Sequence, residues 1–277
     1  MSRELRLRII SGVILGILVL AATWAGGICF RGLAVVIMVL MQYEFSTMAA
    51  APVKAPLANA IGWLSILAAA GFILTSLPSM ALAAIVIGTG GALVAGLKRG
   101  GAWSATAVLY AGFSGLALAE LRGEGLFGLF AMLFVFAIVW STDILAYFCG
   151  RALGGPKLAP AISPGKTWSG AIFGTAAGVG AGVCVALAVR QGGGIMIPLV
   201  ALALSVASQI GDLFESWVKR RFGAKDSSHL IPGHGGVMDR VDGLVFAAFA
   251  AFLLGNLLPL ADHAGIADEL AARLLGL

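Results

Sequence analysis

The stretch LFGLFAMLFVFAIVWSTDILAYF, residues 126–148, has a single charged side chain, Asp143, among its 23 residues. About 20 consecutive apolar residues in a helix cross the ~30 Å hydrocarbon layer of a membrane. This stretch therefore predicts a membrane-spanning helix. Eight further apolar stretches have similar lengths, so that nine spans are predicted: 9–28, 33–51, 57–77, 80–97, 102–119, 126–148, 169–189, 195–216 and 241–260.

The composition agrees with a polytopic membrane protein. Hydrophobic residues make up 60% of the chain and charged residues 11%, whereas a soluble domain has about 25% charged residues to cover its surface. These values exclude a soluble enzyme, a disordered chain and a disulfide scaffold. Because the sequence lacks the alternating segments of a membrane barrel, the predicted fold class is all-α.

The basic residues predict the orientation in the membrane. With nine spans and a cytoplasmic N-terminus, 14 of the 18 Lys and Arg residues fall on the cytoplasmic side. The four on the opposite side are Arg31, Arg122, Arg190 and Arg273. This asymmetry follows the positive-inside rule.

We expect a single transmembrane domain over residues 1–277. Its parts are N-terminal helices in 1–125, catalytic helices with cytoplasmic loops in 126–260, and a short amphipathic tail in 261–277.

One predicted span has a periodic glycine face. Gly170, Gly174, Gly178 and Gly182 repeat every four residues. This spacing lets the backbone of a second helix approach closely, so we expect helix packing along this face.

Polar residues are concentrated in two predicted cytoplasmic segments, of which the first comprises residues 140–169. Asp143 lies within the sixth span, where a carboxylate costs about 2.5–3.5 kcal/mol. We therefore expect it to face a wet cavity, a cation or a basic partner. Ser163, Lys166 and Thr167 precede the seventh span, and such groups beside a helix N-terminus suit an anion site. The hydroxyls also fit ordinary helix caps.

The second polar segment comprises residues 208–243. Its first part is a polar stripe on one helix face, at i, i+4, i+7 and i+11: Ser208, Asp212, Glu215 and Lys219. The stripe leads into a loop that mixes basic residues with carboxylates and glycines: Arg220, Arg221, Lys225, Asp226, His234, Gly235, Gly236, Asp239, Arg240 and Asp242. Positive-inside anchoring accounts for the basic residues but not for the carboxylates or the His-Gly-Gly turn.

This combination of residue types is typical of phosphoryl or nucleotidyl transfer. Carboxylates bind hard cations such as Mg²⁺, which proteins hold through one or two carboxylates together with substrate phosphates. Basic side chains complement phosphates, and glycines let backbone N–H groups approach an anion. A zinc site at His229 and His234 is the weaker alternative, because no cysteine or third histidine is near them in the sequence.

Residues 216–242 resemble the signature of the phosphatidate cytidylyltransferase (CDP-diacylglycerol synthase) family, S-x-[aliphatic]-K-R-x4-K-D-x-[small]-x2-[apolar]-P-x-H-G-G-x-x-D-R-x-D. The matching positions are Ser216, Val218, Lys219, Arg220, Lys225, Asp226, Ser228, Ile231, Pro232, His234, Gly235, Gly236, Asp239, Arg240 and Asp242. The earlier segment is similar to the family at Asp143, Tyr147, Gly150, Ser163-Pro164 and Lys166-Thr167-Trp168. It departs from the family at Ser169, where Glu is common, so we assign no role to residue 169.

The resemblance implies a polytopic inner-membrane enzyme, a homodimer, that converts CTP and phosphatidate into CDP-diacylglycerol and pyrophosphate with Mg²⁺. It implies metal binding by Asp212 and Asp239, and we expect Lys225 to act with them in catalysis. The expected substrate-binding residues are Asp143, Ser163, Lys166, Thr167, Ser208, Lys219, Arg220, Asp226, His234, Gly235, Gly236, Arg240 and Asp242. The residues expected to hold phosphates are Lys219, Arg220, Lys225 and Arg240.

Two other functions fit part of the pattern. A secondary transporter for an anionic solute also contains intramembrane carboxylates and glycine-interrupted helices, but here the carboxylates cluster at one predicted cytoplasmic end. A polyprenol or lipid kinase shares the membrane setting and the polyanion chemistry, but the continuous signature favours the cytidylyltransferase. No nucleic-acid partner is expected.

Overall fold

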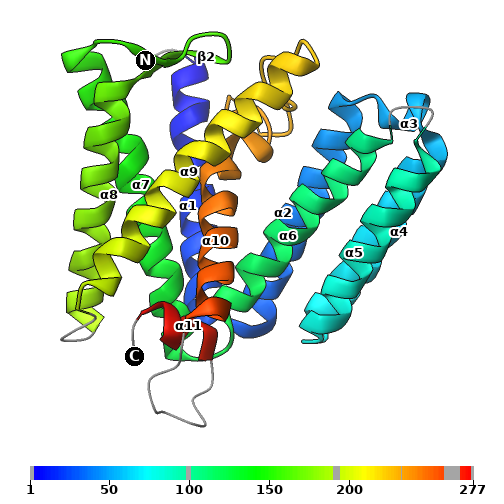
Figure 1. Cartoon of the computed structure of the whole chain (residues 1–277), viewed down its shortest axis with the longest axis horizontal. Coiled ribbons are helices and arrows are strands. Elements are labelled where there is room, and N and C mark those ends of the chain that lie inside the picture. The colour runs from blue at the N-terminus through cyan, green and yellow to red at the C-terminus, as the bar shows by residue number, and fades with distance from the viewer. Residues whose placement is uncertain (1–2, 98–100, 190–193, 232, 259–268, 276–277) are drawn as a thin grey trace. The chain divides into compact units, whose positions relative to one another are not determined.

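The computed structural model describes residues 3–97, 101–189, 194–231, 233–258 and 269–275, and Figure 1 shows its elements. They are α1 (Arg3–Ala25), α2 (Gly27–Met48), α3 (Ala51–Lys54), α4 (Pro56–Leu74), α5 (Pro78–Ala95), α6 (Ala102–Arg122), α7 (Leu126–Leu153), β1 (Lys157–Ala159), β2 (Ser163–Thr167), α8 (Trp168–Val189), α9 (Met196–Arg221), α10 (Met238–Leu257) and α11 (Glu269–Leu274). Pro232 of the signature, and Lys98, Arg99 and Arg190 of the charge count, lie outside the described residues.

The predicted all-α membrane fold is confirmed. Among the described residues, eight helices, α2 and α4 to α10, are long and apolar enough to cross a membrane. The first predicted span falls on α1, where Ile10–Ala25 is a shorter apolar helix. Large apolar side chains such as Ile17, Leu64 and Ile87 are exposed on these helices, as expected where lipid covers the surface.

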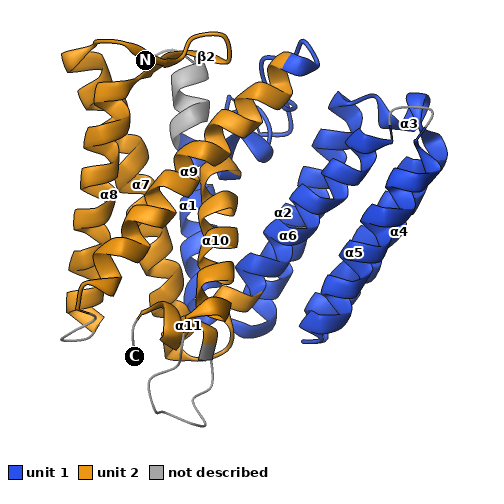
Figure 2. Ribbon diagram, viewed as in Figure 1, with its two compact units in different colours: residues 1–119, 221–241 blue, residues 120–220, 242–277 orange. Residues whose placement is uncertain are grey.

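The chain forms two compact units, which Figure 2 shows in different colours. Unit 1 comprises Met1–Ala119 and Arg221–Val241, and unit 2 comprises Glu120–Arg220 and Asp242–Leu277. We call residues 222–237, between α9 and α10, the signature loop. This loop belongs to unit 1, whereas most of the two helices that it connects belongs to unit 2.

Small residues let the apolar helices of unit 1 pack closely. A Cβ at Gly112 of α6 would lie 2.8 Å from the Ile85 side chain of α5, and one at Gly115 would lie 2.7 Å from the Met38 side chain of α2. Larger residues at either glycine would therefore push these helices apart. The buried face of α2 that results also contains Glu44.

In unit 2, the predicted glycine face of α8 packs as expected. Gly170, Gly174, Gly178 and Gly182 are all buried. A Cβ at Gly170 would lie 2.6 Å from the Ala146 carbonyl oxygen of α7, and one at Gly174 would lie 2.7 Å from that of Thr142. The Thr142 hydroxyl is also 2.8 Å from the Ser205 hydroxyl, which joins α7 to α9. Helix α7 is thus held by close contacts on two neighbouring helices.

We expect Gly174→Ala to lower the unfolding free energy by about 1–3 kcal/mol, because the added methyl group overpacks a backbone contact that cannot move aside. The matched control is Gly180→Ala on the same helix, where the space around a Cβ is open. Removing this exposed helical glycine should stabilise the protein by up to ~1 kcal/mol. Thermal unfolding of both variants in detergent checks the prediction, and equal melting temperatures would contradict it.

A short β-hairpin in unit 2 lies within the first predicted cytoplasmic segment, residues 140–169, for which the sequence predicted no strands. Strands β1 and β2 pair antiparallel, with Lys157 opposite Thr167 and Ala159 opposite Ser163. Gly154 and Gly155 end α7 with φ values of 63° and 97°, a region that glycine adopts without steric cost. The hairpin positions Lys166 and Thr167 immediately before α8.

The described part of the tail is α11, which packs against α7 in unit 2. Ala271, Ala272 and Leu274 are buried. Leu270 contacts α10, because a Cβ at Gly255 would lie 2.9 Å from its side chain. The short helix therefore contributes to the core of unit 2.

Candidate functional site

A buried carboxylate on α2 holds the signature loop in unit 1. Glu44 is 0% exposed. Its Oε1 accepts hydrogen bonds from the Ser228 hydroxyl and the Val237 N–H, both at 2.7 Å. Its Oε2 accepts them from the Ser227 hydroxyl at 2.9 Å and the Met238 N–H at 2.7 Å. Glu44 thus satisfies backbone donors at the start of α10, where unpaired N–H groups and the helix dipole favour an anion.

Asp239 folds the same loop back onto the first turn of α10. Its Oδ2 accepts hydrogen bonds from the Ser227 N–H (2.8 Å), the Ser227 hydroxyl (2.9 Å) and the Gly236 N–H (2.9 Å). A first-turn carboxylate that bonds a preceding N–H reproduces one half of a capping box. This predicted metal ligand therefore also organises the loop, through one of its two oxygens.

Gly236 lies where the two carboxylates and Ser227 come together. A Cβ at this position would collide with the Ser227 hydroxyl and would lie 2.6 Å from the Glu44 Oε1. At neighbouring Gly235 the φ value is 84°, which L side chains rarely adopt. The Gly-Gly pair of the signature is therefore required by the packing of the loop itself.

Replacing Gly236 by alanine should lower the unfolding free energy by about 1–3 kcal/mol, because the methyl group forces Ser227 and Glu44 apart. Activity should fall with it, since the same groups position the loop. Gly32→Ala on α2, where a Cβ meets open space, is the matched control; it should keep wild-type activity and be as stable as the wild type or up to ~1 kcal/mol more stable. Wild-type stability of the Gly236 variant would contradict the described packing.

The signature loop borders a cavity of about 550 Å³ within unit 1. Five of its lining residues were predicted from the sequence as site residues: Lys225, Asp226, His234, Gly235 and Arg240. The Arg240 Nε donates a hydrogen bond to the His234 carbonyl oxygen (3.0 Å), and the His234 Nδ1 lies 2.8 Å from the Ser11 hydroxyl of α1. Basic groups and an ordered His-Gly-Gly turn thus face one cavity that is large enough for a phosphate-bearing ligand.

Unit 2 contains a second polar cluster, formed by three carboxylates and a lysine. Lys166 of β2 forms a salt bridge with Asp212 of α9. Asp143 of α7 and Asp242 of α10 both interact electrostatically with this pair. The sequence had predicted these four as site residues, and the fold brings them together from three helices and the hairpin. The lysine offsets only part of the charge, so the cluster favours a cation.

The residues around Lys166 also have structural roles. The Thr167 hydroxyl accepts a hydrogen bond from the Gly170 N–H (3.1 Å), which makes Thr167 a cap of α8. The Ser169 hydroxyl lies 3.0 Å from that of Thr167 and donates to the Gly154 carbonyl oxygen. Ser163 pairs with Ala159 in the hairpin. Ser169, where the family commonly has Glu, thus ties the hairpin to the end of α7.

The remaining predicted residues of α9 contact α9 itself, α10 or the β-hairpin within unit 2. Ser208 is fully buried, donates to the Ser205 carbonyl oxygen at 2.8 Å, and lies where α9 crosses α10 at Gly243. Lys219 forms a salt bridge with Glu215 (2.5 Å), whose side chain is 1% exposed. The Arg220 Nε lies 3.4 Å from the Ile162 carbonyl oxygen of the hairpin.

The carboxylates offer the hard oxygen donors that Mg²⁺ prefers. Asp212 is in unit 2 with Asp143 and Asp242, and Asp239 is in unit 1. Within the part of the chain that the structure describes, no three His, Cys, Asp or Glu side chains form a ready metal cage. In proteins, Mg²⁺ is usually held by one or two carboxylates together with substrate phosphates. Metal binding by Asp212 and Asp239 stays a prediction.

Sequence reasoning missed Glu44, although a signal for it existed. It is a carboxylate within the predicted span 33–51, and ionisable residues at membrane depth usually face a polar partner. The same argument had been applied to Asp143. The hydrogen-bond partners of Glu44 lie more than 180 residues away in the sequence, so the local sequence pattern could not predict them.

Fold and site together define a polytopic helical membrane protein. Its signature loop contains basic residues and a Gly-Gly turn, which suit the binding of phosphate groups. The chain belongs to the cytidylyltransferase family, whose model matches residues 6–258.

Relatives that match between about half and nine-tenths of the chain agree with this membership. The chain is 51% identical over 255 residues to the phosphatidate cytidylyltransferase of Brucella abortus (strain 9-941), covering 91% of this chain and 93% of that protein. It is 44% identical over 154 residues to that of Haemophilus influenzae, covering 53% and 52% of the two chains. With that of Bacillus subtilis it shares 39% identity over 154 residues, covering 53% and 56%.

Proposed function

We propose that the protein is a phosphatidate cytidylyltransferase, which makes CDP-diacylglycerol and pyrophosphate from CTP and phosphatidate. One observation carries the proposal: similarity to a protein of that name extends over 91% of the chain. The signature loop, with its cavity and bracing carboxylates, supplies the chemistry that such a reaction needs.

The central difficulty of this reaction is repulsion between two polyanions. A phosphate oxygen of phosphatidate attacks the α-phosphorus of CTP, the bond from that phosphorus to the bridging oxygen breaks, and pyrophosphate leaves. A phosphate monoester has a second pKa near ~6 and is largely ionised at neutral pH, so no strong general base is required. Catalysis then consists of neutralising charge and aligning the reacting oxygens.

The residues of this chain divide these tasks. Lys225 and Arg240, which line the cavity of the signature loop, hold phosphate groups, while His234, Gly235 and Gly236 shape the loop around them. As the family resemblance implies, Asp212 and Asp239 would hold Mg²⁺, which would supply charge neutralisation and orientation of phosphate oxygens. In unit 2, Lys166 forms a salt bridge with Asp212 and interacts electrostatically with Asp143. We infer from the family resemblance that Asp143, Ser163, Lys166 and Thr167 bind the nucleotide.

The location of the reaction follows from the charge distribution. We infer a site that faces the cytoplasm, because 14 of 18 basic residues fall on that side in the sequence count. The inner membrane as its location is what the family resemblance implies. Phosphatidate then reaches the site from the bilayer with its headgroup at the cytoplasmic interface. The enzyme is expected to work as a homodimer, as the family resemblance implies.

The direct test uses purified full-length protein in detergent with labelled CTP and phosphatidate. Formation of labelled CDP-diacylglycerol that stops when EDTA removes Mg²⁺ and resumes when Mg²⁺ is restored is the expected result. A lipid that carries a phosphodiester instead of the monoester should give no product. If no CDP-diacylglycerol forms with Mg²⁺ present, the proposed function is wrong.

A further inference from the structure

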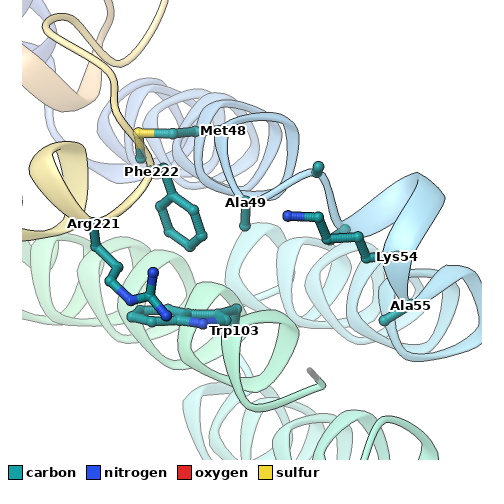
Figure 3. Close-up of a pocket in the computed structure, with 9 residues that line it drawn as sticks. Met48, Ala49, Lys54, Ala55, Trp103, Arg221 and Phe222 are labelled. Carbon is teal, nitrogen blue, oxygen red and sulfur yellow. The ribbon is translucent and has the colours of Figure 1, made fainter. Parts of the chain in front are cut away.

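A second cavity in unit 1 involves none of the predicted site residues. It has a volume of about 420 Å³ and lies where the end of α2, the short α3, the start of α6 and the end of α9 come together. Figure 3 shows the Arg221 side chain against the Trp103 ring, with Phe222 beside them and the Lys54 side chain on another side of the cavity. Two cationic and two aromatic side chains therefore border one hollow.

The lining of this cavity has a net positive charge. Lys54 and Arg221 are the charged ones among the nine described residues that line it, and none of these nine is a carboxylate. Both cationic side chains are exposed. Arg221 occupies an unspecified position of the family signature, between the matched Arg220 and Lys225, so the signature gives it no task. The positive charge is thus available to an anion that enters from outside.

The aromatic wall indicates an anion with an apolar part. The rings of Trp103 and Phe222 meet edge to face, with centroids 4.9 Å apart. Tryptophan concentrates at membrane interfaces, where its ring contacts both lipid and headgroup layers. Val53 and Leu57, which are close in the chain to the lining residues Lys54 and Ala55, are 83% and 64% exposed. The cationic and aromatic lining suits the headgroup of a lipid, and the exposed apolar side chains suit its acyl chains.

We propose that this cavity binds the phosphate headgroup of an anionic phospholipid at the membrane interface. Lys54 and Arg221 pair with the phosphate, Trp103 and Phe222 contact the glycerol backbone, and the acyl chains lie along the surface of Val53 and Leu57. The volume falls within the ~300–1,000 Å³ of typical small-ligand pockets. A free phosphate compound has the same charge, and the apolar surroundings favour the lipid.

The test measures binding of dioctanoyl-phosphatidylglycerol to full-length protein by native mass spectrometry. This lipid is a phosphodiester and lacks the nucleophile of the proposed reaction, so the result is independent of turnover and of the proposed function. We expect it to bind at least ~10-fold more tightly than dioctanoyl-phosphatidylcholine. The double substitution Lys54→Gln/Arg221→Gln should weaken its binding about 10- to 30-fold, since each basic residue attracts an anionic lipid substantially.

The matched control is Arg151→Gln/Lys157→Gln, which removes two exposed basic residues of unit 2 and should leave the binding unchanged. Equal weakening by both double substitutions, or equal binding of the two lipids, would overturn the proposal. Displacement of the lipid by millimolar pyrophosphate or CTP would assign the cavity to a free phosphate compound instead. If the double variant does not fold, Lys54→Gln alone decides: a loss of about 3-fold or more supports the lipid site, and wild-type binding refutes it.

Discussion

The substitution Asp212→Asn should reduce CDP-diacylglycerol formation by about 10²–10³-fold, the range typical for removing one electrostatic contact to a reacting centre. Asp212 is the residue of the unit 2 cluster that pairs with Lys166 and interacts with both Asp143 and Asp242. Asparagine keeps the shape of the side chain and removes its charge. The cluster then has one negative charge fewer and attracts a cation less strongly. Lys166 also loses the carboxylate with which it pairs.

Initial rates at several Mg²⁺ concentrations measure this effect. If Asp212 holds the metal, the variant should require more Mg²⁺ as well as turning over slowly, whereas its melting temperature should stay near that of the wild type. Glu124→Gln, at an exposed position between α6 and α7, is the isosteric control. A rate close to wild type in Asp212→Asn would remove this residue from the catalytic machinery.

The substitution Glu44→Gln should lower the unfolding free energy by about 3 kcal/mol or more. Each Glu44 oxygen accepts a backbone N–H, from Val237 or from Met238. An amide has only one acceptor oxygen, so its NH₂ group faces a backbone donor and leaves it unsatisfied, at ~1–3 kcal/mol for each buried group. Turnover should be lost along with the ordered loop. Melting temperature and hydrogen exchange at residues 237 and 238 report the two effects.

Gln42 provides the matched control on the same helix. It is also fully buried, and its amide nitrogen and oxygen have no hydrogen-bond partner among the described residues. Gln42→Met should therefore leave stability unchanged or raise it by ~1 kcal/mol, since a buried polar group without partners is removed. Equal destabilisation by the two substitutions would show that burial in α2, rather than the bonds of Glu44, determines the effect.

The membrane fold could be predicted from the sequence because lipid imposes a simple rule on helix length and hydrophobicity. Each predicted span lies mainly on one helix, and the glycine face of α8 packs as its four-residue spacing indicated. Helix ends were less predictable. Helix α7 continues to Leu153, beyond the apolar stretch. Its end is set by the backbone conformation of Gly154 and not by the end of the hydrophobic pattern. The β-hairpin depends on pairing across a turn that composition does not reveal.

The chemistry of the site was partly predictable for a similar reason. Carboxylates and lysines stand out in an apolar chain, so Asp143, Lys166, Asp212 and Asp242 could be named before their proximity was known. The hydrogen bonds of Glu44 could not be predicted, since they join α2 to a loop far along the chain. Nor did the motif reveal that Gly236 must be small to admit Ser227.

The long interval between Glu44 and its partners has a consequence for biosynthesis. Ser227 follows Glu44 by 183 residues, and at ~5–20 residues per second a ribosome needs roughly ten to forty seconds to make them. During this time α2 is in place while its carboxylate lacks the donors that later surround it. We therefore expect the N-terminal part of unit 1 to stay incompletely folded until the signature loop has been synthesised and packs against it. A substitution at Glu44 would then be detected first as a protein that is inserted normally but degraded early.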